Sequence, residues 1–118
     1  MLTTAQAKNF SSPDEVRNLS KTRVEVINLG DDTLMKLTLE PGWKWSEHVK
    51  PQVGTSSCEV EHFGYCISGR LHIRMDDGTE VEIGPGGVDA IPPGHDAWVV
   101  GDEPWVGLDF VGGKTYGK

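Results

Sequence analysis

The sequence predicts an all-β domain. Two segments, residues 35–40 and 70–75, alternate strictly between apolar and polar side chains, with the apolar ones at the odd positions. Such alternation is typical of strands that bury one face. Further short apolar segments follow, and turns rich in Gly, Pro and Asp separate them. Many short strands between turns of this kind indicate a barrel or a sandwich.

One short helix is expected near the start, over residues 13–19. Ser12 can cap a helix, Pro13 suits the first helical position, and Glu15 lies three residues after Ser12, as in a capping box. We therefore expect an N-terminal segment with this helix, residues 1–22, followed by a barrel domain, residues 23–113.

The strands expected after this helix follow from alternation and turn residues. The turn at Asp76-Asp77-Gly78 predicts a hairpin between residues 70–75 and the strand that follows it. The complete set of expected strands is 35–40, 70–75, 81–83, 88–91, 98–100 and 105–110.

Charge and composition limit the partners. The chain has 118 residues and a formal net charge of −7 at pH 7. This charge repels phosphates, so we expect no nucleic acid and no membrane as a partner. No apolar run approaches the roughly 20 residues of a membrane span. The first residues also lack the basic start and apolar stretch of a signal peptide.

The cysteines and tryptophans lead to two further expectations. Cys58 and Cys66 are too few for a disulfide framework, which favours a reducing, cytoplasmic location. The apolar, tryptophan-containing strands leave edges that pairing with another copy would cover, so we expect a homodimer.

Two motifs occupy the middle of the chain. The first begins at Gly42, reaches His48 after five residues, and closes with His62, six further residues and Gly69. The second spans residues 86–97 and contains Pro-Pro-Gly. Together they resemble the cupin superfamily, whose motifs read G-x5-H-x-H-x3-4-E-x6-G and G-x5-P-x-G-x2-H-x3-N. The resemblance implies a double-stranded β-helix, or jelly-roll barrel, that binds a small molecule beside a divalent metal.

The resemblance implies metal ligands at His48 and His62, although several motif positions differ. Lys50 stands at the second motif histidine, His62 at the glutamate, and Ala97 at the histidine of the second motif. His95 precedes Ala97 by two residues and so shares its face of a strand. It is either a displaced third metal ligand, an acid/base group, or a side chain that bonds the loop backbone.

The candidate ligands also suggest the metal. Imidazoles suit Zn, Fe, Ni or Cu better than Mg or Ca, and a site with few protein ligands leaves room for water or substrate. Lys50 is either a surface lysine or a group that binds an anion or moves a proton. By strand parity Cys66 shares the face of His62, whereas His72 lies on a charged face and is expected in solvent.

Two functions remain open. The first is a metal-dependent enzyme, similar to the dioxygenases and isomerases of the cupin superfamily, in which His95 or Lys50 moves a proton. The second is a ligand-binding or sensory module without metal and without catalysis. Ala97 in place of a histidine favours the second function, and the three histidines His48, His62 and His95 favour the first.

Overall fold

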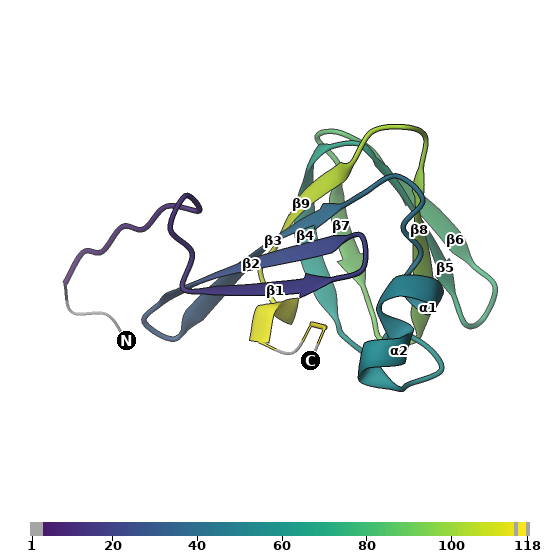
Figure 1. The fold of residues 1–118 in the computed structure, drawn as a ribbon, viewed down its shortest axis with the longest axis horizontal. Helices are drawn as coiled ribbons and strands as arrows, with labels where there is room; N and C mark the ends of the chain where they lie inside the picture. Colours follow the sequence, from purple (N-terminus) through teal and green to yellow (C-terminus); the bar gives the residue numbers. More distant parts are fainter. Residues whose placement is uncertain (1–3, 115, 118) are drawn as a thin grey trace.

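The computed structural model describes residues 4–114 and 116–117, and it confirms the all-β architecture. The strands of these residues form two antiparallel sheets, one of order β1-β2-β3-β9-β4-β7 and one of order β6-β5-β8, which curve into a barrel (Figure 1). The strands are β1 (Glu15–Leu19), β2 (Thr22–Leu29), β3 (Asp32–Leu39), β4 (His62–Ser68), β5 (Arg70–Met75), β6 (Glu80–Ile83), β7 (Val88–Ile91), β8 (His95–Val100) and β9 (Trp105–Asp109).

The apolar residues of the alternating strands fill the inside of the barrel, as the sequence predicts. On β3, Met35, Leu37 and Leu39 are buried, and on β5 the buried apolar residues are Leu71 and Ile73. Burying one face of each strand removes apolar area from water at about 25 cal/mol per Å². The six strands expected after residue 22 all exist, with ends shifted by a few residues. Burial of alternate residues therefore accounts for the closed core.

The N-terminal helix expected over residues 13–19 is wrong. Residues of this segment form β1, which pairs antiparallel with β2 along its whole length. The Asp14 N–H donates to the Val26 carbonyl, and the Asp14 carboxylate accepts from the Asn28 N–H instead of capping a helix. An isolated helix below about 12 residues is marginal in water. The edge of β2 offers the same backbone groups hydrogen-bond partners, so the strand forms.

Two short helices lie instead between β3 and β4, α1 (Trp45–His48) and α2 (Lys50–Val53). The chain becomes irregular only after α2. Gly54 ends α2 in the left-handed conformation, with a φ of 79°. The two helices cover one end of the barrel (Figure 1).

A 3₁₀ turn, η1 (Gly112–Lys114), follows β9. No helix in the described part of the chain is long and apolar enough to span a membrane.

Candidate metal centre

A cavity of about 40 Å³ lies inside the barrel. Its walls are mostly apolar and come from both sheets and from α1. The polar and ionisable residues that face it are Cys58, His62, Asp89, His95, Asp109 and Tyr116. A water molecule occupies about 30 Å³ of the liquid, so the cavity has room for an ion with a water, or for a very small molecule.

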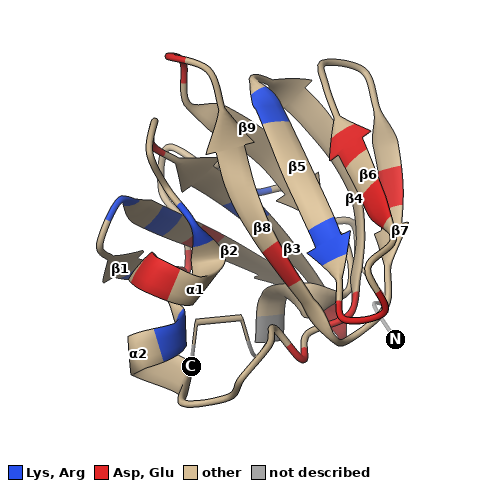
Figure 2. Cartoon of the chain, turned by 90° about the vertical axis from the view of Figure 1, so that its right-hand side faces the viewer, with Lys and Arg blue, Asp and Glu red and all other residues tan. Residues whose placement is uncertain are grey.

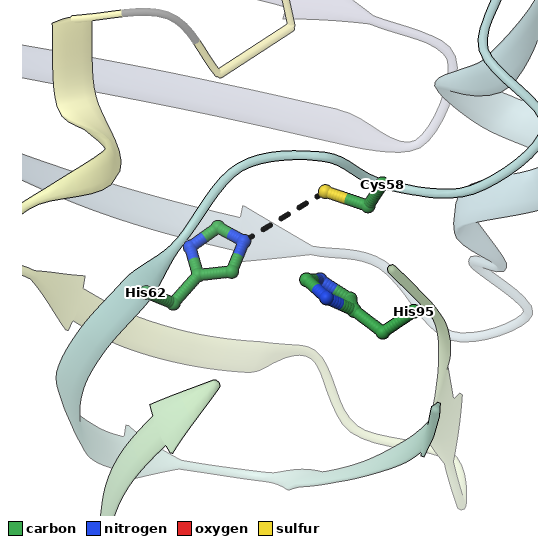
Figure 3. Close-up of side chains that lie close together, drawn as sticks. All are labelled: Cys58, His62 and His95. Carbon is green, nitrogen blue, oxygen red and sulfur yellow. Dashed lines mark hydrogen bonds between the residues drawn. The ribbon is translucent and has the colours of Figure 1, made fainter. Parts of the chain in front are cut away.

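Three of these side chains form a cluster. Each of Cys58, His62 and His95 offers one ligand atom, and the three atoms lie within 4.8 Å of one another. Figure 3 shows the three side chains reaching into a common space, with the sulfur of Cys58 beside the ring of His62. The Cys58 Sγ is 3.8 Å from the His62 Nε2, and the ring centroids of the two histidines are 5.3 Å apart.

Backbone hydrogen bonds hold Cys58 against His95. The Cys58 N–H donates to the His95 carbonyl at 2.8 Å, and the Gly94 N–H donates to the Cys58 carbonyl at 2.8 Å. Gly94 has a φ of +93°, a conformation that suits glycine. The Pro-Pro-Gly turn therefore places His95 at the start of β8, and the single β-bridge brings Cys58 beside it.

Both imidazoles are fixed through Nδ1. The His95 Nδ1–H donates to the Pro92 carbonyl at 2.9 Å, which leaves the other ring nitrogen, Nε2, to interact with the Cys58 thiol or with a ligand. The His62 Nδ1 is hydrogen-bonded to Asp109. The other carboxylate oxygen of Asp109 accepts from the backbone N–H groups of Val111 and Gly112, each at 2.9 Å. Metal-binding histidines commonly show this pattern, in which one ring nitrogen is held by a carboxylate or a carbonyl and the other is free for the metal.

The cluster changes the acidity of its members. Burial opposes the charge on His62, but its hydrogen bonds to Asp109 and Cys58 outweigh burial and raise the pKa to about 9. Burial likewise opposes a thiolate at Cys58, yet the hydrogen bonds from His62 and His95 lower its pKa to about 7. For Asp109, the His62 hydrogen bond overcomes burial and lowers the pKa. Cys58 is therefore easily converted to the thiolate that binds metals.

An apolar hollow adjoins the cavity. It measures about 280 Å³ and is lined mainly by α1, α2 and the segment after them. Trp45, Cys58 and Tyr116 line both the hollow and the cavity. Tyr116 is 3% exposed, and its ring meets the ring of His62 edge-on at 5.6 Å. These three side chains, Trp45, Cys58 and Tyr116, therefore lie between the two spaces.

Solved structures share this architecture at low sequence identity. Ectoine synthase from P. lautus matches with a TM-score of 0.68 and 14% identity, over 96% of this chain and 81% of that chain. The polyketide cyclase RemF from Streptomyces resistomycificus matches with a TM-score of 0.64 and 19% identity, over 92% and 79%. A cupin-like protein from Thermotoga maritima matches with a TM-score of 0.54 and 16% identity, over 76% and 67%.

The chain has the cupin fold. No protein-family model and no curated protein matches it. Because a fold of this kind hosts many activities, the likeness leaves the function to be argued from the site.

Within this cupin barrel, the residues predicted as site residues lie in two places. His62 and His95 line the cavity, and so does Ala97. His48 lies on α1, where its Nδ1 is within 3.0 Å of the Lys44 backbone nitrogen, and it lines a different surface hollow beside β1. Lys50 begins α2 and is not among the residues that line the cavity. The structure therefore does not bring His48 or Lys50 to the cluster.

Cys58 was the member of the cluster that the sequence analysis missed. The cupin motif allows three residues between its second histidine and its glutamate, and Cys58 precedes His62 by that spacing. Counting forward from Gly42 led instead to His48, because the two helices between β3 and β4 lengthen this part of the motif. Counting backward from His62 would have found Cys58.

Proposed function

We propose that the chain binds one divalent transition metal through Cys58, His62 and His95 and acts as an enzyme on a small molecule. The proposal rests on one observation, which is that three strong ligand atoms lie within 4.8 Å of one another inside an apolar barrel. Buried polar groups normally pair with protein groups. Here the three ligand atoms have one another as neighbours, and the Cys58 sulfur and the His62 Nε2 lie 3.8 Å apart.

The donor set fits a soft or borderline metal. One thiolate and two neutral imidazoles are ligands of Zn, Cu or Fe and not of Mg or Ca. Asp109 and Pro92 already occupy the two Nδ1 atoms, so a metal would take the Nε2 atoms and would displace the proton that His62 carries below a pH of about 9. Three protein ligands would leave at least one metal position open for water or substrate.

The chain supplies the remaining parts of the chemistry. A metal held by Cys58, His62 and His95 would supply a Lewis acid for a substrate oxygen or for a water. The apolar walls of the cavity exclude bulk water and strengthen electrostatic interactions there. Asp89 projects into the same cavity from β7, and burial raises its pKa. We assign proton transfer to the Asp89 carboxyl rather than to Lys50, because Lys50 does not line the cavity.

The size of the cavity limits the substrate. Pockets for drug-sized ligands measure about 300–1,000 Å³, whereas this cavity measures about 40 Å³. A substrate larger than a few atoms must therefore extend into the adjoining hollow of about 280 Å³. The hollow is lined by apolar side chains such as Val49, Val53 and Val60. We infer a small molecule with a polar head for the metal and a short apolar body.

Elemental analysis of the protein purified without an affinity tag tests the proposal. We expect about one transition metal per chain, as in mononuclear sites. Replacement of Cys58 by Ser, or of His62 or His95 by Ala, should abolish metal retention. After loading with cobalt, the wild type should show a thiolate-to-cobalt charge-transfer band that the Cys58→Ser variant lacks.

Two histidine variants serve as matched controls. His48→Ala and His72→Ala remove imidazoles that do not line the cavity, so both variants should retain the metal. Retention of a full metal content by the His62→Ala/His95→Ala double variant would contradict the proposed site. Loss of metal in His48→Ala would instead support the ligand set expected from the sequence.

A second candidate function is a metal-free enzyme with a cysteine nucleophile. Cys58, His62 and Asp109 form a thiol–imidazole–carboxylate chain, an arrangement that activates nucleophilic cysteines. If the wild type acquires no metal under any loading condition and Cys58 alone reacts rapidly with a small electrophile, this candidate replaces the metal enzyme. If Cys58 is also unreactive, the chain is better described as a ligand-binding module.

A further inference from the structure

Two of the three proposed metal ligands lie on strands, and the third lies on an irregular segment. His62 begins β4 and His95 begins β8. Cys58 belongs to residues 54–61, between α2 and β4, where the regular structure is a single β-bridge to His95. Irregular segments are generally more mobile than strands. The position of the Cys58 sulfur therefore depends on the contacts that hold this segment.

The turn that follows β5 contacts both the Cys58 segment and the start of β8. The Asp76 Oδ1 accepts a hydrogen bond from the Ser57 hydroxyl at 2.6 Å. The Asp76 N–H donates to the Gly94 carbonyl at 2.9 Å. An added Cβ on Gly94 would lie 3.0 Å from the Asp76 Oδ2, so the carboxylate also packs on this glycine. Asp76 thus joins the residue before Cys58 to the residue before His95.

The hydrogen bond between Ser57 and Asp76 has the geometry of a strong one. Its length of 2.6 Å is typical of an O–H donor and a carboxylate acceptor, for which about 2.5–2.7 Å is usual. Ser57 is 9% exposed, so its hydroxyl needs a partner within the protein. Its carbonyl also accepts from the Thr55 hydroxyl at 2.6 Å. The residue before Cys58 is therefore held through both its side chain and its backbone.

Asp77, the neighbour of Asp76, bonds a different part of the chain. The turn after β5 is acidic, as its red colour next to the blue residues of β5 shows (Figure 2). The Asp77 carboxylate accepts from the Thr79 N–H at 2.9 Å and from the Thr79 hydroxyl at 2.7 Å. Asp77 therefore closes its own turn, whereas Asp76 reaches across to the Cys58 segment.

We propose that Asp76 is a positioning residue for the metal centre, because it fixes the Cys58 segment against the start of β8. The role assigned to Asp76 rests on the proposed metal-binding function. Asp76 is exposed and is not among the residues that line the cavity, so it acts through Ser57 and Gly94. Contacts that orient metal ligands from outside typically change the metal affinity by about 10- to 100-fold.

Cobalt titration of the purified protein tests the proposal. Asp76→Ala and Ser57→Ala should each bind cobalt about tenfold more weakly than the wild type. Asp76→Asn keeps an acceptor for the Ser57 hydroxyl and should lose less affinity. The Ser57→Ala/Asp76→Ala double variant should bind about as tightly as either single variant, since both substitutions remove the same hydrogen bond. At saturating cobalt every variant should regain the thiolate-to-cobalt band, because Cys58 is still present.

Asp77→Ala is the matched control. It removes the same charge one residue away and leaves the Ser57 hydrogen bond intact, so it should bind cobalt like the wild type. A loss in Asp77→Ala equal to the loss in Asp76→Ala would show a general effect of charge and would overturn the proposal. Unchanged affinity in both Asp76→Ala and Ser57→Ala would overturn it as well.

A second measurement uses metal-free protein in a Cys66→Ser background, where Cys58 is the single thiol. Asp76→Ala and Ser57→Ala should raise the rate of Cys58 modification by a thiol reagent about threefold or more, and Asp77→Ala should leave it unchanged. Equal rates in all variants overturn the role of Asp76, whereas a wild type that binds no cobalt overturns the proposed function. Far-UV spectra show whether each variant is folded. Ser57→Ala, which changes no charge, keeps the test decisive if Asp76→Ala fails to fold.

Discussion

His62 is the residue on which the candidate site depends most. Its Nδ1 is bonded to Asp109 and its Nε2 faces Cys58. Because the side chain is largely buried, its charge is stable only through these partners. Asp109 is in turn held by the N–H groups of Val111 and Gly112. A Cβ on Gly112 would lie 2.9 Å from the Asp109 Oδ2, so this support requires glycine.

Asp109→Asn should lower the pKa of His62 in the metal-free protein. The variant removes the charge that raises this pKa to about 9, while the burial that lowers it remains. A histidine with a raised pKa contributes stability that is fully present below its ordinary pKa of about 6.5 and is lost as the pH rises through about 9. We therefore expect a loss of about 3 kcal/mol near pH 6 and a smaller loss above pH 9.

NMR titration of the histidine rings and urea unfolding at the two pH values measure these effects. The control is Glu80→Gln, which removes the carboxylate that bonds His72 on the surface. This variant should leave the titration of His62 unchanged. An Asp109→Asn protein whose His62 still titrates near pH 9 would show that Asp109 is not the cause of the shift.

At the scale of elements, β9 shows how one strand serves both the core and the site. Trp105 begins it and Asp109 ends it, and both line the cavity. The indole of Trp105 lies across Gly107, where an added Cβ would be 2.1 Å from the Trp105 Cη2. Gly107 is therefore required by close packing and not by its backbone angle. The Trp105 Nε1–H is buried and has no hydrogen-bond partner among the described residues.

Gly107→Ala and Trp105→Phe should accordingly lower the free energy of unfolding by different amounts. The alanine methyl cannot fit beside the indole, so we expect a loss of about 1–3 kcal/mol or more, as for overpacked cores. Trp105→Phe removes an unpaired buried N–H, whose burial without a partner is itself unfavourable, and should cost less than Gly107→Ala. Urea unfolding of the two variants measures both free energies. Equal costs would argue against the packing of Trp105 over Gly107.

Three of the strands that the sequence predicted have an alternation of apolar and polar residues that is clear without any tertiary information. Strands β3, β5 and β6 show it, and the structure has them. β1 was predicted as a helix because a capping box is a local signal, whereas pairing with the edge of β2 is a long-range one. α1 and α2 were missed because they are too short to show a helical period.

The candidate site was harder to predict than the fold, because its residues meet through contacts between distant parts of the sequence. The parity of His95 with Ala97 predicted an inward side chain, and both residues line the cavity. His48 failed to reach the cavity because motif spacing assumes an uninterrupted strand, and here the chain leaves the barrel to form two helices. The bridge between Cys58 and His95 joins residues far apart in sequence, so only the fold reveals it.

At the scale of the whole molecule, the side chains between the cavity and the adjoining hollow bear on access to the candidate site. Trp45, Cys58 and Tyr116 line both the cavity of about 40 Å³ and the apolar hollow of about 280 Å³. Tyr116 belongs to the segment after β9, and its backbone is held from two sides. Its carbonyl accepts from the Arg17 side chain at 2.7 Å, and its N–H donates to the Gly112 carbonyl at 3.1 Å. These bonds keep the buried ring of Tyr116 between the two spaces, and we expect its removal to join them.

Tyr116→Ala should open the cavity and expose Cys58. With the ring gone, a thiol reagent in the hollow can reach the sulfur without local unfolding, so the rate of Cys58 modification should rise about tenfold or more. The measurement uses metal-free protein in a Cys66→Ser background, which leaves Cys58 as the single thiol. Tyr116→Phe keeps the ring and should react at the wild-type rate. If Tyr116→Ala is folded and Cys58 reacts no faster, the entrance lies elsewhere in the barrel wall, and a substrate would not approach through the hollow.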